Sequence, residues 1–208
     1  SVREFVVERA IYRREHAVGL SPWAYLLSKV AVLGLLVGVQ CALFTVLALL
    51  GQPGPDQALL LGNGNVEIAV AVAAVGFTMT IAGLAVSAAA TSTEQTMPAL
   101  VALVMAQLIL CGGLFAVGGR PGIEQVAWLL PARFGYAATA ATTGLQRPPA
   151  PRIDPLFDST TEQWLLDIGA LGLQSCVLLV LAMWALNRSV TRNIWREARR
   201  KFARNGLR

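Results

Sequence analysis

Long stretches of this chain contain no charged residue, and they restrict the fold more than any other feature. Val30–Leu50 and Met97–Gly119 hold no Asp, Glu, Lys or Arg. An apolar run of about 18 or more residues without charges is long enough to cross a bilayer as a helix. Since 55% of the 208 residues are hydrophobic and 14% are charged, the whole chain has the composition of a membrane protein.

The apolar pattern predicts an all-α membrane protein with four transmembrane helices, at residues 30–50, 67–89, 97–117 and 164–186. Gly and Pro at 51–55 end the first of them, because neither residue continues a helix. The second span is rich in Ala, Gly, Ser and Thr, which let helices approach closely in lipid. We therefore expect it to be buried among the others.

Charged residues near the spans are interpreted by position. Glu67 and Glu94 lie at the ends of predicted spans, so we interpret both as solvated boundary residues.

The three cysteines, Cys41, Cys111 and Cys176, fall inside apolar spans. We interpret them as small buried hydrophobic residues rather than as partners in disulfides or as metal ligands.

Residues 118–163 form the longest region without a predicted span. Part of it is too polar, and too interrupted by Pro131 and Gly135, to cross a bilayer, yet too apolar for a solvated loop. We expect an extracytoplasmic loop with a re-entrant or interfacial helix, and Trp128 and Tyr136 near the lipid headgroups.

Basic residues gather at the two ends of the chain. Five Arg or Lys residues precede the first span, eight follow the last one, and four lie in the long loop. An excess of Arg and Lys marks the cytoplasmic side, so both termini are expected inside the cell, at the plasma (inner) membrane. Residues 1–29 are expected to form a cytoplasmic amphipathic helix, broken by Gly19 and Pro22, and residues 187–208 a basic cytoplasmic tail. The start without Met suggests a fragment or the later part of a longer polypeptide.

Several catalytic patterns are absent from the sequence. There is no GxxxxGK[ST] phosphate-binding loop, and a single His leaves no His cluster for a metal and no Ser-His-Asp set. We expect no catalytic site, metal or cofactor on this chain, and no nucleic-acid partner.

Two ordered motifs resemble the permease domain of the ABCG (White-type) exporters, the type-two ABC exporters. "VVERAIYRREHAVGLSPWAYLLSKV" resembles the segment before the third helix of that family, with Glu8, Glu15, Gly19, Tyr25 and Lys29 at the matching positions. The second motif begins with "CGGLFAVGG", which is similar to the outer end of the fifth helix of the family. "WLLPARFGYAATA" is similar to the re-entrant segment, with Trp128, Pro131, Arg133 and Tyr136.

The resemblance covers essentially the whole chain, but the first two of the six family helices are missing. The composition further resembles that of mycobacterial members that fuse forkhead-associated domains, an ATPase and this permease. The resemblance implies a permease driven by ATP hydrolysis, with ATP and magnesium on an ABC nucleotide-binding domain, a second permease copy as partner in a homodimer, and membrane lipids around it.

The resemblance also implies roles for particular residues. The charged segment corresponds to a coupling helix that docks on the ATPase, with Glu8, Arg9, Tyr12, Arg13, Arg14 and Glu15 as its contact residues. Leu114 and Phe115 occupy the position of a bulky apolar gate. Gln107, the amide of the third span, is a candidate for substrate contact, and bonding between helices is equally open.

The function expected from these features is the permease part of an ATP-driven exporter that moves a lipidic or amphipathic cell-envelope compound outward. A membrane scaffold without a transport path is the main alternative. A lipid-modifying enzyme is disfavoured because no nucleophile lies beside a base. The charged segment could instead meet anionic lipid, and the proposed gate could be ordinary packing.

Overall fold

The computed structural model of the protein describes residues 21–52, 54–55, 58–89, 93–114, 117–145 and 154–205. Within these ranges every regular element is a helix and there is no strand, which confirms the predicted all-α class. Three helices are long and apolar enough to cross a membrane, over Trp23–Leu49, Gly64–Ala89 and Thr161–Arg188. A fourth apolar stretch, Met97–Leu110, is shorter.

The first long helix, α3 (Pro22–Leu49), begins earlier than the predicted span at Val30. Ser21 is its N-cap, since its Oγ accepts the backbone N–H of Ala24 at 3.1 Å. Pro22 follows as the first helical residue, where a missing N–H costs nothing. Pro22, which the sequence marks as a break, therefore also opens the membrane helix.

Helix α5 (Thr93–Leu110) ends at Leu110 rather than at Val117, where the third span was expected to end. Gly112 has a φ of 93°, a conformation that L side chains rarely adopt. The apolar composition continues beyond this point, but the backbone turns, so a count of apolar residues overestimates the helix.

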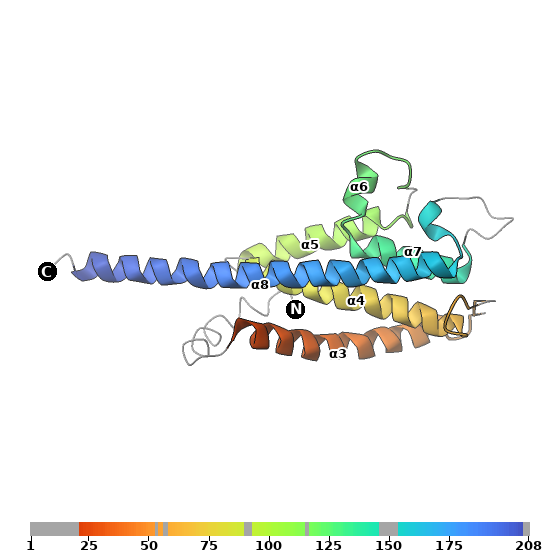
Figure 1. Cartoon of the computed structure of the whole chain (residues 1–208), viewed down its shortest axis with the longest axis horizontal. Helices are drawn as coiled ribbons and strands as arrows, with labels where there is room; N and C mark the ends of the chain where they lie inside the picture. The colour runs from red at the N-terminus through yellow and green to blue at the C-terminus, as the bar shows by residue number, and fades with distance from the viewer. Residues whose placement is uncertain are drawn as a thin grey trace.

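Helix α4 (Gly64–Ala89) lies at the centre of the bundle and packs against α3, α5, α7 and α8 (Figure 1). Its small residues allow this: a Cβ at Gly76 would stand 2.7 Å from Sγ of Cys41 and 2.8 Å from Cγ1 of Val37. The predicted burial of this helix is confirmed.

The long loop region contains α6 (Ile123–Ala127), α7 (Pro131–Thr143) and the 3-10 helix η1 (Pro155–Phe157). These elements gather at the end of the bundle where α4 and α8 begin, which we call the α7 end (Figure 1). Pro131 starts α7, and nine of the thirteen residues of α7 are buried. The predicted helix in this loop is present and folds back against α4 and α8.

The last helix, α8 (Thr161–Asn205), is continuous for 45 residues. It includes the predicted fourth span and continues through most of the basic segment, beyond the ends of the other helices (Figure 1). The apolar part and the basic part of the described chain therefore form one continuous helix.

Candidate functional site

A buried ion pair lies at the α7 end of the bundle. Nη2 of Arg133, in the first turn of α7, donates a hydrogen bond of 2.7 Å to Oδ2 of Asp154. The two side chains are 0% and 2% exposed. Oδ1 of Asp154 also accepts the N–H of Leu156 at 3.1 Å and so caps η1. The ion pair therefore joins the helix that folds back into the bundle to the segment that leads into α8.

A second buried carboxylate, Asp167 of α8, interacts electrostatically with both Arg133 and Asp154. Its Oδ1 accepts a hydrogen bond of 3.1 Å from Nε2 of Gln163. Its Oδ2 has no hydrogen-bond partner within the described residues, and neither do Nε and Nη1 of Arg133. Buried ionic groups are costly unless they are paired. The α7 end therefore encloses a cluster of ionisable side chains inside the bundle.

The sequence predicts Glu67 as a solvated boundary residue, and this prediction is wrong. Its side chain is 0% exposed because the loop before α4 folds over it. The carboxylate accepts the backbone N–H groups of Leu59, Leu60 and Leu61, at 3.1, 2.6 and 2.9 Å, and the hydroxyl of Thr142 at 3.3 Å. Several N–H and O–H donors of this kind stabilise a carboxylate that is buried away from water. Glu67 therefore fastens the loop to the C-terminal end of α7. The side chain of Glu94 lies outside the described residues.

Gln107 of α5 bonds to two neighbouring elements. Its Oε1 accepts the backbone N–H of Ala132 at 2.8 Å, and its Nε2 lies 3.3 Å from Sδ of Met79 as a donor. The side chain is 7% exposed. The structure thus shows bonding between helices, while substrate contact by Gln107 stays a prediction.

The other described residues of the predicted gate and re-entrant segment lie at the same end. Leu114 follows the turn after α5 and is 73% exposed. The carbonyl oxygen of Trp128 accepts a hydrogen bond of 2.9 Å from Nε2 of Gln174. The ring of Tyr136 packs edge-on against Phe157, with 5.3 Å between ring centroids.

Other predicted site residues fall outside the described part of the chain. They are Phe115 of the gate and the six coupling residues, Glu8, Arg9, Tyr12, Arg13, Arg14 and Glu15. Their roles stay predictions.

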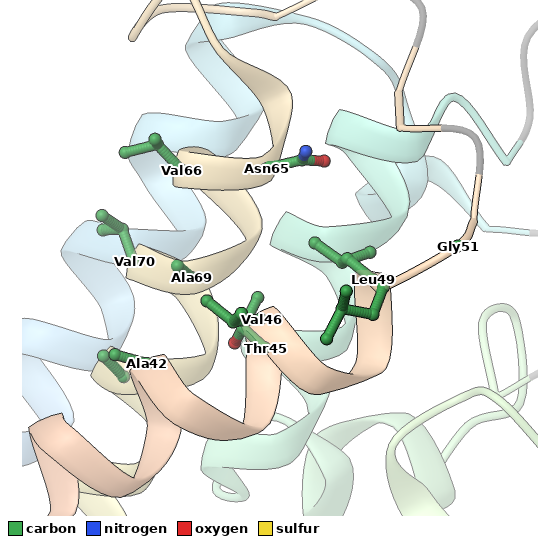
Figure 2. Close-up of a pocket in the computed structure, with 11 residues that line it drawn as sticks. Ala42, Thr45, Val46, Leu49, Gly51, Asn65, Val66, Ala69 and Val70 are labelled. Atoms are coloured by element: carbon green, nitrogen blue, oxygen red, sulfur yellow. The ribbon is translucent and has the colours of Figure 1, made fainter.

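An open groove of about 600 Å³ lies between α3 and α4 (Figure 2). It is lined by Ala42, Thr45, Val46, Leu49, Leu50, Gly51, Asn65, Val66, Ala69, Val70 and Ala73. The hydroxyl of Thr45 donates to the carbonyl oxygen of Cys41 at 2.8 Å, so it offers little polarity to the groove. This lining suits a hydrocarbon chain better than a charged ligand.

No candidate metal site occurs in the described ranges, where no group of three or more His, Cys, Asp and Glu side chains is placed to hold an ion. The thiols of Cys41, Cys111 and Cys176 are free. Cys41 and Cys111 are half-buried, but Cys176 is exposed on α8, contrary to its predicted burial.

Comparison with known proteins identifies the kind of bundle that this is. Residues 1–143 match the family described as ABC-2 type transporter. The chain belongs to the ABC-2 type transporter family. Over 191 residues it is 41% identical to the ABC transporter ATP-binding/permease protein Rv1747 of Mycobacterium tuberculosis. No solved structure gives a significant match.

This ABC-2 type chain is a component of membrane transport, and the predicted resemblance to ABC permease domains is confirmed. The match to the mycobacterial relative covers 89% of the chain but only 22% of the relative. The chain thus spans about a fifth of the length of that protein.

The sequence did not predict that three acids of this ABC-2 type chain are buried, namely Glu67, Asp154 and Asp167. Signals for two of them exist in the sequence. Asp154 directly precedes Pro155, a pair that favours the start of a turn or helix. Asp167 follows Gln163 by four residues, a spacing at which helical side chains meet, and it lies in an apolar helix, where an acid indicates a specific role.

Proposed function

We propose that this chain is the permease part of an ATP-driven exporter that moves a lipidic or amphipathic cell-envelope compound outward across the plasma membrane. The observation that supports this most is the 41% identity to a relative whose name combines ATP binding with a permease. ATP and magnesium would then be bound by a nucleotide-binding domain, in the same polypeptide or in a separate chain. Both ends of this chain would face the cytoplasm, beside that domain.

The apolar surface of the chain favours such a substrate. One side of α5 exposes large apolar side chains, namely Val101, Val104, Met105, Leu108 and Ile109. A second copy facing this side would enclose an apolar path between two α5 helices. An amphipathic molecule could move along such a path with its hydrocarbon part out of water, whereas a highly charged solute would lose its hydration there.

The gate of this path is proposed at Leu114 and Phe115, directly after α5. Leu114 is 73% exposed in the single chain, so its side chain is available for contact with a second copy. Bulky apolar side chains that meet across a narrow path close it by excluding water.

The coupling element is proposed in residues 8–15. The family match includes these residues, and they carry charges of both signs, Glu8 and Glu15 with Arg9, Arg13 and Arg14. Exchangeable ion pairs of this kind could hold a nucleotide-binding domain through its opening and closing.

The test is charge reversal in the full-length protein, reconstituted in proteoliposomes with a fluorescent phospholipid as probe. In Glu8→Lys/Glu15→Lys we expect ATP hydrolysis to continue while ATP-dependent movement of the phospholipid is lost. Glu162→Lys is the matched control, because Glu162 is an exposed acid at the start of α8, and it should leave both rates unchanged. Normal lipid-stimulated turnover in the double variant would refute the coupling role. An unsubstituted protein that moves no phospholipid and shows no response of its ATPase to lipids would favour a scaffold.

A further inference from the structure

The groove between α3 and α4 starts where the close packing of these two helices ends. Near the middle of α3, a Cβ at Gly34 would stand 2.8 Å from Cε2 of Phe77, and a Cβ at Gly76 would stand 2.8 Å from Cγ1 of Val37. The glycines thus keep the two helices in contact, with no room for a further side chain. The lining of the groove begins at Ala42, directly beyond this contact and toward the α7 end.

Short side chains leave the groove open. Ala42 of α3 and Ala69 and Ala73 of α4 line it, and their methyl groups are too short to fill the space between the two helices. Larger apolar side chains, such as Val46 and Val66, line it from both helices (Figure 2). A molecule in the groove is therefore in contact with α3 on one side and with α4 on the other. Such contacts are individually weak, but they add up along an apolar chain.

The lining also restricts the chemistry of the occupant. None of the lining residues is charged. The hydroxyl of Thr45 bonds within α3, and the other polar side chain, Asn65, lies at the end of the groove near Gly51, opposite to Ala42 (Figure 2). A charged ligand would lose its hydration here without gaining a partner. The occupant is therefore apolar along the groove, and any polar group that it carries lies at the Asn65 end.

The position of the groove on the surface identifies the source of such a molecule. Helix α3 is long and apolar enough to cross a membrane, and Leu43, Phe44 and Leu47, which lie beside the groove in the sequence, are exposed. Side chains exposed on a membrane-spanning helix of this kind face the acyl chains of the bilayer. Since the groove is continuous with this lipid-facing surface, acyl chains reach it directly.

The groove extends over one leaflet. From Ala42 to Leu50, α3 advances by about 12 Å, which is less than half of a hydrocarbon core of about 30 Å. Leu50 directly follows the last residue of α3, so the groove runs from the end of the spanning helix toward its middle. A single acyl chain that enters from the membrane boundary fits this course.

We propose that the groove between α3 and α4 is a binding site for one acyl chain of a phospholipid in the leaflet at the α7 end. The ester end of the chain lies near Asn65, and its tail points toward Ala42 and Ala73. The site is separate from the proposed transport path, because the groove is lined by α3 and α4 whereas the path is proposed along α5. Lipid binding in the groove therefore does not require that the protein transports lipid.

Two substitutions fill the groove. Ala42→Leu adds a larger side chain from α3, and Ala69→Leu adds one from α4. The matched control is Ala48→Leu, because Ala48 is exposed on α3 like Ala42 but does not line the groove. If Ala69→Leu, at a half-buried position, fails to fold, Ala42→Leu decides the question.

The measurement is photo-crosslinking of the full-length protein in phosphatidylcholine vesicles. A small part of the phosphatidylcholine carries a diazirine in the middle of one acyl chain, and labelled residues are located by mass spectrometry of peptides. We expect more label on residues 42–50 and 65–73 than on Leu173, Val177 and Val180, which are exposed on α8 without a groove. Ala42→Leu and Ala69→Leu should remove this excess, and Ala48→Leu should keep it.

Three results would overturn the lipid site. Label on the groove that does not exceed the label on α8 would show ordinary bulk lipid at its surface. An excess that persists in both groove-filling variants would show that the label does not depend on the groove. A disulfide between two copies at Val46→Cys, with the three native cysteines replaced by Ser, would show that a second copy covers it.

The proposed function is tested separately. If the unsubstituted protein moves no fluorescent phospholipid, the proposed function fails, and the crosslinks still report whether the groove binds an acyl chain. If the protein moves phospholipid but the groove gains no excess label, the lipid site fails and the proposed function stands.

Discussion

Gln107 and Ala132, 25 positions apart in the chain, are joined by a hydrogen bond of 2.8 Å from the backbone N–H of Ala132 to Oε1 of Gln107. Ala132 is in the first turn of α7, where backbone N–H groups have no partner within the helix. The N-cap residue of α7, Leu130, has no side-chain acceptor to offer. Helix α5 therefore supplies the cap of α7, and the helix that leads to the proposed gate is fixed to the helix that folds back into the bundle.

Substitution of this cap should weaken the fold. Gln107→Leu removes the acceptor for Ala132, and we expect the free energy of unfolding to fall by about 1 kcal/mol, the usual cost of losing a helix cap. The measurement is denaturant unfolding of the purified protein in detergent, followed by tryptophan fluorescence. Met79→Leu removes only the contact with Nε2 of Gln107 and should have a smaller effect. Equal losses in the two variants would contradict the capping role.

The buried carboxylate of Glu67 gives a second prediction. Both carboxylate oxygens of Glu67 accept N–H groups of residues 59–61. Glu67→Gln keeps one acceptor oxygen and replaces the other by an NH₂ group, which cannot accept a hydrogen bond. Since this leaves buried donors without partners, we expect a loss of about 1–3 kcal/mol in the free energy of unfolding. Amide hydrogen exchange at residues 59–61 should become faster. Glu162→Gln, at an exposed acid, should change neither quantity. Exchange that stays slow in Glu67→Gln would show that other contacts hold the loop.

The close approach of α4 and α7 gives a third prediction. A Cβ at Gly135 would overlap the side chain of Val75, so Gly135→Ala forces the two helices apart. We expect a loss of about 1–3 kcal/mol in stability, as is usual for overpacking. Val75→Ala in the same protein should restore part of it, because it vacates the space that the new methyl group needs.

The control for this prediction is Gly169→Ala, where a Cβ meets no atom within 4 Å. The midpoint of thermal unfolding should fall for Gly135→Ala and stay the same or rise for the control. If the Val75→Ala/Gly135→Ala protein is less stable than either single variant, the two sites do not share one contact.

Sequence reasoning named Arg133 and Gln107 but not their partners, and it missed the three buried acids. The resemblance gave Leu114 to the gate and Trp128, Arg133 and Tyr136 to the re-entrant segment, and the structure brings the elements that carry them to the α7 end. The partners of these residues were not predictable. Arg133 was expected only as part of a motif, yet it is fully buried against an acid 21 positions away.

The sequence by itself determined that the chain lies in a membrane, that it is helical, that the central helix α4 is buried and that the long loop contains a helix. These follow from local properties, since the length of an apolar run, the density of small residues and the position of Pro act on the segment that contains them. Only the tertiary structure decided that α5 stops at Leu110, that Glu67 is enclosed, and that Arg133 meets Asp154. The reason is that a local sequence pattern indicates only whether a segment prefers lipid or water. Which buried donor meets which acceptor depends on how distant segments pack, and that is settled by the whole bundle at once.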